Sequence, residues 1–323
     1  MDKRLLTIDI SHGTTHDGPG MRTTVFVKGC PLHCLWCHNP ESIGIQNETW
    51  WTAQDCIGCD SCIQACPQGA ISWSEEKLRT DRSRCERCGS CVEACPTNAM
   101  SWQGKEYDLE TLLEEVLRDK NYYRQFGGGV TCSGGEPLLQ HEFVAELFRR
   151  LQAEGISTAL DTCGFAPWSN LEHVLPWTNY VLYDVKLIQS DRHKQFTGAP
   201  NERILDNLCY TAEYVRRAEH PIRIWIRTPL IPGITTEPEN IRGIGAFISE
   251  HLLDVVERWE LCAFNGVCAA KYDKLGAVWP FAGKGAMSET EIDLIRQAAY
   301  TVVPKENVIV TGMIRAAVED NQA

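Results

Sequence analysis

Residues 15–42 read THDGPGMRTTVFVKGCPLHCLWCHNPES, and three cysteines closely follow a run of β-forming residues within them. Residues 23–28 predict a strand because β-branched and aromatic side chains dominate this run. Cys30, Cys34 and Cys37 come after it with the spacing C-x3-C-x2-C. A [4Fe-4S] cluster has four irons and normally takes four thiolates, so three cysteines leave one iron open to another ligand.

The composition describes a globular chain with reduced thiols. The chain has 323 residues, is 43% hydrophobic, and carries a net charge of -12, which disfavours nucleic acid and anionic membranes as partners. The N-terminal residues lack the apolar core of a signal peptide, and no run approaches the roughly 18 apolar residues of a membrane span. We therefore expect a cytoplasmic protein with neither a nucleic-acid nor a membrane partner.

Sixteen cysteines in a cytoplasmic chain indicate metal binding or catalysis, because the cytosol keeps thiols reduced. For the three-cysteine loop, the alternative to an iron-sulfur cluster is a zinc site completed by His33 or His38.

Strand and helix signals alternate through most of the chain. Further short runs rich in β-formers lie at residues 129–133, 157–161, 180–186, 223–227, 258–264 and 307–312. Helical apolar periods lie between them at residues 108–119, 141–155, 202–219, 238–252 and 288–300. Repeated strand-helix units imply a parallel sheet with helices outside, either a barrel or a doubly wound sheet.

One segment, from about residue 55 to residue 97, breaks this alternation. It contains the internal repeat CIGCDSCIQACP against CERCGSCVEACP, each with the spacing C-x2-C-x2-C-x3-C-P of bacterial ferredoxins. Structural zinc sites also use C-x2-C pairs, but zinc does not account for two matched runs of four cysteines, each closed by C-P. We expect an insert with two [4Fe-4S] clusters. The resulting division of the chain is 1–52, 53–102 and 103–323.

Further motifs extend the pattern of residues 15–42 along the chain: SGGEP at 133–137, LDTCGF at 160–165, YDVK at 183–186 and WIRTPLIPG at 225–233. In this order they resemble the radical S-adenosylmethionine (SAM) enzymes that activate glycyl radical enzymes, and the insert is similar to that of the larger members. The resemblance implies an α/β fold, a partial (β/α)6 radical SAM barrel with an inserted bacterial-ferredoxin-like domain. It also implies that the open iron chelates the amino and carboxylate groups of SAM.

The likeness to bacterial ferredoxins implies which cysteines of the insert share a cluster, because there the fourth cysteine of each run ligates the other cluster. One implied set is Cys56, Cys59, Cys62 and Cys95. The other is Cys85, Cys88, Cys91 and Cys66. Together with the three-cysteine loop, the resemblance implies three [4Fe-4S] clusters.

The family resemblance also implies residues around SAM. Gly134, Gly135 and Glu136 match the motif that binds the SAM ammonium group. Asp184, Val185 and Lys186 match a stretch that lines SAM, and Arg227 matches an arginine near its carboxylate, which suits a guanidinium fork. Without the resemblance, the glycines would be read as a flexible turn and the strand-end charges as surface ion pairs or solvated groups.

Further residues complete the implied site. Asp161 and Thr162 match a monovalent-cation site beside SAM. Trp36 and His38 flank the last cysteine of the loop and would wall the adenine pocket, although ordinary packing also explains them. Asn265 stands where many members have a histidine; its amide can hydrogen-bond a ribose or adenine but cannot carry a proton.

These features predict a glycyl radical enzyme activating enzyme. By resemblance, one electron cleaves SAM to methionine and a 5'-deoxyadenosyl radical, which removes a hydrogen atom from a backbone glycine of the partner enzyme. A flavodoxin or ferredoxin would donate the electron through the insert, and the protein would be a monomer. The alternatives are a radical SAM enzyme acting on a small molecule or another protein, and a plain electron carrier, which would have no use for the three-cysteine loop.

Overall fold

The computed structural model describes residues 4–315. At its centre lies a nine-stranded sheet with the order β13-β12-β11-β10-β9-β8-β2-β1-β7. Seven of these strands run parallel to one another: β2 (Arg22–Val27), β8 (Gly129–Gly134), β9 (Ser157–Thr162), β10 (Tyr180–Asp184), β11 (Arg223–Leu230), β12 (Val256–Ala263) and β13 (Val308–Thr311). β1 (Leu5–Thr14) and β7 (Lys105–Tyr107) add an antiparallel edge. The expected parallel sheet is confirmed.

The strand order decides between the two expected sheet types. From β8 to β13 the order advances without reversal, whereas a doubly wound sheet reverses its order at a switch point. Right-handed crossovers in one direction place the connecting helices on one face. β7 and β13 form the two edges of the sheet, so it is an open curved wall.

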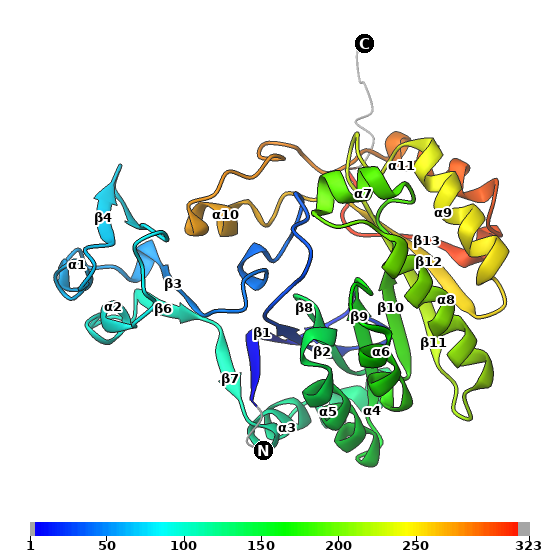
Figure 1. Cartoon of the computed structure of the whole chain (residues 1–323), viewed down its shortest axis with the longest axis horizontal. Helices are drawn as coiled ribbons and strands as arrows, with labels where there is room; N and C mark the ends of the chain where they lie inside the picture. The colour runs from blue at the N-terminus through cyan, green and yellow to red at the C-terminus, as the bar shows by residue number, and fades with distance from the viewer. Residues whose placement is uncertain (1–3, 316–323) are drawn as a thin grey trace, which may run out of the picture.

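Helices follow the strands and cover one face of the sheet, as Figure 1 shows for α5, α6, α8 and α9. Their bounds are α3 (Leu109–Leu117), α4 (Lys120–Phe126), α5 (His141–Ala153), α6 (Trp168–Val174), α7 (Ser190–Thr197), α8 (Glu202–Arg217), α9 (Pro238–His251), α10 (Ala269–Leu275) and α11 (Glu289–Tyr300). Short 3-10 turns are η1 (Pro40–Ser42), η2 (Ala53–Asp55), η3 (Pro137–Gln140), η4 (Leu175–Trp177) and η5 (Lys305–Asn307). Asp108 caps α3 and Ser288 caps α11, which explains why these helices begin where the sequence predicts.

One continuous apolar core lies between the sheet and these helices. Phe148 of α5, Leu208 of α8 and Ile244 of α9 are fully buried in it together with strand residues such as Val181 and Leu261. Burying each such side chain contributes roughly 1.5–3 kcal/mol, so the wall is a firm support for whatever lies at its edge. Within residues 4–315 we find no helix with the length and apolarity needed to cross a bilayer.

Residues 53–102 lie beside this wall, on the left of Figure 1. They start after β3 (Glu48–Trp51) and end within β6 (Met100–Gln103), and these two strands pair antiparallel as a neck. The remaining elements are α1 (Ser61–Gln64), β4 (Ile71–Ser74), β5 (Lys77–Thr80) and α2 (Ser90–Glu93). Four buried residues, Ile71, Leu78, Cys91 and Met100, make up their apolar cluster. A core of this size leaves the segment in need of another source of stability.

Candidate active site

The cysteine loop, residues 29–39, lies at the carboxyl end of β2. The amide of Gly29 donates to the carbonyl of Ser42 at 2.7 Å, which closes the loop against η1. The amide of His33 donates to the carbonyl of Thr197 at 2.7 Å, which ties the middle of the loop to the end of α7. Because these are backbone bonds to separate elements, the wall fixes the shape of the loop.

α10 holds the other side of the cysteine loop. The hydroxyl of Tyr272 donates to the carbonyl of Cys37 at 2.9 Å. The ammonium of Lys271 lies 2.6 Å from a carboxylate oxygen of Glu41 and donates to the side-chain oxygen of Asn39 at 2.7 Å. The last cysteine of the loop therefore depends on a helix more than two hundred residues away in the chain.

The three thiols of the loop share a buried environment. Burial raises the pKa of Cys34 to about 12 and raises that of Cys37 well above its usual value, and the charge of each neighbouring thiol adds to the effect. A hydrogen bond with Cys163 lowers the pKa of Cys30. Buried thiols of this kind are neutral until a metal displaces their protons, and their mutual influence suits one shared metal group.

Gly134 and Gly135 allow the end of β8 to approach the cysteine loop. Gly134 has φ +105°, and a Cβ there would lie 2.5 Å from the amide nitrogen of Val27. A Cβ on Gly135 would lie 2.1 Å from the carbonyl oxygen of Gly29, which also accepts the amide of Glu136 at 2.7 Å. We expected the glycines to give access to a ligand; in the structure the group that they approach closely is the backbone of β2 and of the loop.

Glu136 is fully buried. One carboxylate oxygen accepts from the amide of Leu138 at 3.0 Å and from the hydroxyl of Thr162 at 2.7 Å, and the other accepts from the amide of Cys163 at 2.8 Å. Burial raises the pKa of this carboxyl, against these hydrogen bonds. The side chain thus joins the ends of β8 and β9 from within, and it does not face an open site.

Opposite charges gather where β9, β10 and β11 end. Lys186 Nζ lies 2.5 Å from Asp184 Oδ2, and Arg227 Nη1 lies 3.2 Å from Asp161 Oδ2. Arg227 also lies 3.4 Å from a carboxylate oxygen of Glu260 on β12. Lys186 is only 8% exposed, so these groups are not a solvated surface pair.

Lys186 also faces the cysteine loop. Burial alone would lower its pKa, but the charges of Asp184 and of the Cys34 and Cys163 thiols outweigh burial and raise it. Burial raises the pKa of Asp161 to about 6 even though Arg227 opposes this. The structure therefore gathers the predicted strand-end residues into one charged cluster beside the three thiols.

Asp161 and Thr162 have separate partners. Asp161 accepts from the hydroxyl of Ser133 at 2.6 Å in addition to pairing with Arg227. The hydroxyl of Thr162 points to the other face of the strand, as successive strand residues do, and bonds to Glu136. The two side chains are not brought together as one set of cation ligands.

The remaining predicted residues divide into two pairs. Trp36 is 4% exposed and Val185 is 1% exposed, and both belong to the main apolar core. His38 lies against the backbone of Asn265, and burial lowers the pKa of its imidazole. The Asn265 side-chain oxygen accepts from the amide of Val267 at 3.3 Å. The first pair supports the site by packing, and the second lies at the rim.

The cysteines of residues 53–102 surround two small cavities. One, the Cys59 cavity, is lined by Cys56, Cys59, Cys62 and Cys95. The other, the Cys88 cavity, is lined by Cys66, Cys85, Cys88 and Cys91. Each cavity takes three cysteines from one repeat and the fourth from the other, the arrangement that the ferredoxin likeness implies.

The sulfurs around both cavities have matching hydrogen-bond partners. The thiol of Cys59 lies 3.3 Å from the hydroxyl of Ser61, and that of Cys88 lies 3.3 Å from Ser90. These contacts lower the pKa of both thiols. Backbone amides of Ala70 and Met100 donate to the sulfurs of Cys66 and Cys95, each at 3.3 Å. Amide donors to sulfur stabilise thiolate ligands and tune cluster potentials.

In residues 4–315 the thiols do not form a site for a single metal ion. A tetrahedral zinc ion needs sulfurs roughly 3.8 Å apart, from a metal-sulfur distance of about 2.3 Å. Within residues 4–315, no three His, Cys, Asp or Glu side chains converge closely enough for a single ion. Each of the two cavities is instead lined by four thiols.

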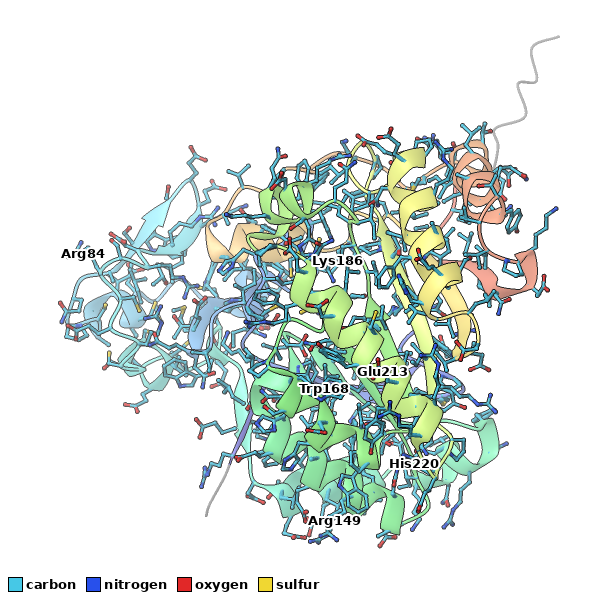
Figure 2. All side chains as sticks on the ribbon, turned by 45° about the vertical axis from the view of Figure 1, so that its right-hand side comes forward. Arg84, Arg149, Trp168, Lys186, Glu213 and His220 are labelled. Carbon is cyan, nitrogen blue, oxygen red and sulfur yellow. The ribbon has the colours of Figure 1, made fainter. Side chains whose placement is uncertain are left out.

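A wide groove lies elsewhere, on the outer face of the wall. Trp168 and Glu172 of α6 line it together with Tyr210 and Glu213 of α8 and with His220. Figure 2 shows Trp168 and Glu213 on these outer helices and His220 just beyond the end of α8, all below Lys186, while Arg84 lies far off in the cysteine-rich segment. The groove contains none of the predicted site residues.

Sequence reasoning missed Lys271, Tyr272 and Glu260, which all touch the site. Lys271 and Tyr272 lie in a seven-residue helix with no motif of its own. Glu260 is 3% exposed within β12, where a carboxylate in an apolar strand is the one signal that something must pair with it.

Comparison with known proteins agrees with this geometry. The model of the radical SAM superfamily matches residues 24–242. The chain is 38% identical to the (2S)-3-sulfopropanediol dehydratase activating enzyme of Klebsiella oxytoca, over 84% of this chain and 85% of that protein. It is 41% identical to the isethionate sulfite-lyase activating enzyme of Nitratidesulfovibrio vulgaris, over 76% and 80% of the two chains. It is 37% identical to the indoleacetate decarboxylase activating enzyme of Tractidigestivibacter scatoligenes, over 85% and 88%.

Two solved structures are similar to this chain. Streptococcus suis SuiB bound to its precursor peptide SuiA aligns with a TM-score of 0.50 at 12% identity, over 88% of this chain and 46% of that one. A domain of a pyruvate-formate lyase-activating enzyme from Bacteroides vulgatus aligns over 57% of this chain and 99% of its own, with a TM-score of 0.45 and 27% identity. The first likeness concerns the fold alone.

Proposed function

This chain belongs to the radical SAM superfamily and to its glycyl radical enzyme activating enzymes, and from that membership we propose that it activates a partner glycyl radical enzyme. The observation that carries the proposal is the cysteine loop, which gathers three thiols, and not four, beside the charges of Lys186, Asp184 and Arg227. Three thiols suit a cluster with one iron left for SAM.

Cys30, Cys34 and Cys37 hold the SAM-binding cluster in this proposal. When bound, the cluster and SAM supply a one-electron cleavage of SAM whose radical product removes a hydrogen atom from a backbone glycine of the partner. The cation of Lys186 offsets the negative charge of the thiolates beside it. Because the wall fixes the loop before any ligand binds, little ordering is required at the moment of reaction.

Charged residues at the strand ends orient SAM. Arg227 Nη2 has a single long contact, 3.4 Å to the carbonyl of His16, so this edge of the guanidinium is available to the SAM carboxylate. The backbone of Gly134 and Gly135 receives the ammonium group, since the Glu136 side chain is engaged within the protein. Asp184 keeps Lys186 in position beside the loop.

Packing and rim residues complete the SAM site. Trp36 and Val185 support it from the core, and His38 with Asn265 lies on the adenine side. The monovalent cation expected at Asp161 and Thr162 stays a prediction, because Arg227 already neutralises Asp161.

The insert, residues 53–102, is a bacterial-ferredoxin-like domain in this proposal. Its Cys59 and Cys88 cavities each hold a [4Fe-4S] cluster, so the chain carries three. The flanking segments, 1–52 and 103–323, together form the partial (β/α)6 barrel. The insert relays electrons from a flavodoxin or ferredoxin, and the chain acts as a monomer. Support for the relay comes from two complete sets of four thiols, which leave no iron for substrate.

The test uses the partner itself. The reduced protein, SAM and the glycyl radical enzyme encoded beside it should together give a glycine-centred radical, visible by electron paramagnetic resonance (EPR) as a doublet from the remaining α-hydrogen. A partner with alanine at the target glycine should give none. If that partner stays silent while another small molecule or protein accepts the hydrogen abstraction, the chain is a radical SAM enzyme of the alternative kind.

A further inference from the structure

We propose that the insert is an ordered relay in which the Cys88 cavity stands between the Cys59 cavity and the cysteine loop. Electrons that reach the Cys59 cavity then arrive at the loop only through the Cys88 cavity. This inference rests on the relay role proposed above, and it adds an order that the cysteine spacing does not contain.

The neck of the insert orders the two cavities. Glu48 pairs with Gln103 at one end of the β3-β6 ladder, and Trp51 pairs with Met100 at the other. The Gln103 end is the one near the wall, because the Gln103 amide donates to the carbonyl of Ile8 in β1 at 3.4 Å and the chain then continues into β7. Figure 1 shows this passage from β6 into β7 beside β1.

The cavities lie at different heights on this ladder. Thr49, near the wall, lines the Cys88 cavity, whereas Trp51 and Met100, at the far end, line the Cys59 cavity. Trp102, the partner of Thr49, also packs over Gly89 beside Cys88. Residues two apart on a strand share a face and are separated by roughly 6.6 Å, so the Cys88 cavity is nearer the wall by about that distance.

The Cys88 cavity also has a short connection to the cysteine loop. Thr49 belongs to the segment that follows Ile43, whose carbonyl accepts the amide of Cys30 at 3.1 Å. One residue that lines this cavity is therefore six positions along the chain from a residue that bonds the cysteine loop.

The two cavities are themselves close together. Cys62 and Cys95 of one set and Cys66 and Cys91 of the other all pack against the single apolar cluster of the insert. An electron can thus pass from one cavity to the other across a shared core.

Counting electrons tests the order. The fully loaded chain is reduced with excess low-potential chemical reductant, freed of reductant, and mixed with excess SAM. Each SAM takes up one electron as its sulfur-carbon bond breaks, and the radical product then takes a hydrogen atom from the glycine of the partner enzyme, which is added in excess, so each methionine formed counts one delivered electron. With one electron stored per cluster, the unaltered chain should give about three methionines. Cys59→Ala should give about two methionines. Cys88→Ala should give about one, because the electron stored in the Cys59 cavity then cannot reach the cysteine loop.

Every other set of methionine counts contradicts the proposed order of the two cavities. If Cys59→Ala gives about one methionine per chain and Cys88→Ala gives about two, the order of the two cavities is reversed. If both variants give about two methionines, each cavity passes its electron to the loop independently. About one methionine from all three proteins refutes the relay itself, without touching the activating function. Cys209→Ala, on α8, is the matched control and should behave like the unaltered chain.

A second measurement reads the same order without turnover. In the reduced chain, the EPR signal of the loop cluster should be broadened by its nearest reduced neighbour; the broadening should persist in Cys59→Ala and vanish in Cys88→Ala, and the reverse result refutes the order. Retention of about eight irons in each variant verifies that the other insert cluster is intact. If a variant falls to about four irons, Cys56→Ser and Cys85→Ser, whose oxygens can still ligate iron, carry the same comparison.

Discussion

The two cysteine-bearing regions of this chain are built in opposite ways. In the cysteine loop, the thiols of Cys34 and Cys37 are buried, and backbone hydrogen bonds to η1, α7 and α10 hold the loop in place. In the insert, Cys59 and Cys88 are exposed, and the apolar cluster has four buried residues. Contacts with the wall fix the conformation of the loop, whereas the conformation of the insert has to be stabilised largely by the groups that its cysteines bind.

The thiols of the two regions also differ in their charge environment. Burial raises the pKa of Cys34, and Lys186 provides the nearby cation that compensates once this thiol is ionised. In the insert, hydrogen bonds from serine and from the backbone lower the pKa of Cys59 and Cys88 instead. A thiolate is thus stabilised by a buried lysine in the cysteine loop and by local hydrogen bonds in the insert.

The largest expected effect separates the chemistry of the two regions. Cys34→Ala should abolish methionine formation from SAM, a loss of at least about a thousandfold, because the SAM-binding cluster loses a ligand. It should remove about one third of the iron and leave the melting temperature of the wall nearly unchanged. Iron analysis and a methionine assay measure both effects. Persistent cleavage in this variant, with Cys209→Ala as the control, would place the SAM site elsewhere.

Removing all iron should separate the stability of the two regions. We expect chelated protein to lose almost all amide hydrogen-exchange protection between residues 53 and 102, since four buried residues cannot hold that segment together. Strands β8 to β12 should keep their protection because the main core does not involve metal. Equal protection of the insert with and without iron would show that the contrast between the two regions is wrong.

A buried carboxylate tests how the wall fixes the cysteine loop. Glu136→Gln keeps the shape of the side chain but turns an amide toward backbone and hydroxyl donors, so the free energy of unfolding should fall by about 1–3 kcal/mol. Denaturant unfolding measures this loss, and the iron content of the loop should fall with it. The control is Glu146→Gln on α5, whose carboxylate is 39% exposed and pairs with Arg149. Equal stability of the two variants would contradict the role assigned to Glu136.

The sequence predicts the wall better than its edges. The parallel strands have clear runs of β-forming residues, and the long helices have a clear helical period of apolar residues. The positions predicted from these patterns agree closely with the structure. α7 has no such signal, since its sequence SDRHKQFT is polar and buries only His193 and Thr197. β7 has three residues, and its pairing with β1 depends on a partner a hundred positions away. Elements without a local period are defined by contacts that a local pattern does not encode.

The same limit applies to the site. Cysteine spacing predicts which residues gather around each cavity, because the pattern is local within each repeat. The burial of Glu136 and the pairing of Arg227 with both Asp161 and Glu260 depend on three neighbouring strands packing together. The contact of Tyr272 with Cys37 depends on the return of α10 to the loop. These are long-range facts of packing.

The smallest expected effect lies where the two regions touch. Asp273 of α10 pairs with Lys77 at 2.8 Å and with Arg79 at 2.8 Å, both on β5 of the insert, and next to it Lys274 Nζ lies 4.8 Å from the centre of the Trp50 ring. The side chain of Asp273 is 48% exposed, and ion pairs of this kind contribute about 0.2–1 kcal/mol each. Asp273→Ala should therefore leave the free energy of unfolding almost unchanged.

The same substitution should loosen the insert against α10, because the neck, Trp50 and the bond from Arg79 to the Asp273 backbone carbonyl are then the remaining links on that side. We expect faster amide exchange in β5 at low salt, and no difference from the unaltered chain at high salt, where the ion pairs are already screened. Asp293→Ala, which removes an exposed carboxylate paired within α11, is the charge-matched control and should leave β5 unaffected. Unchanged exchange in β5 at low salt would mean that the neck alone fixes the insert, and that α10 supports only the cysteine loop.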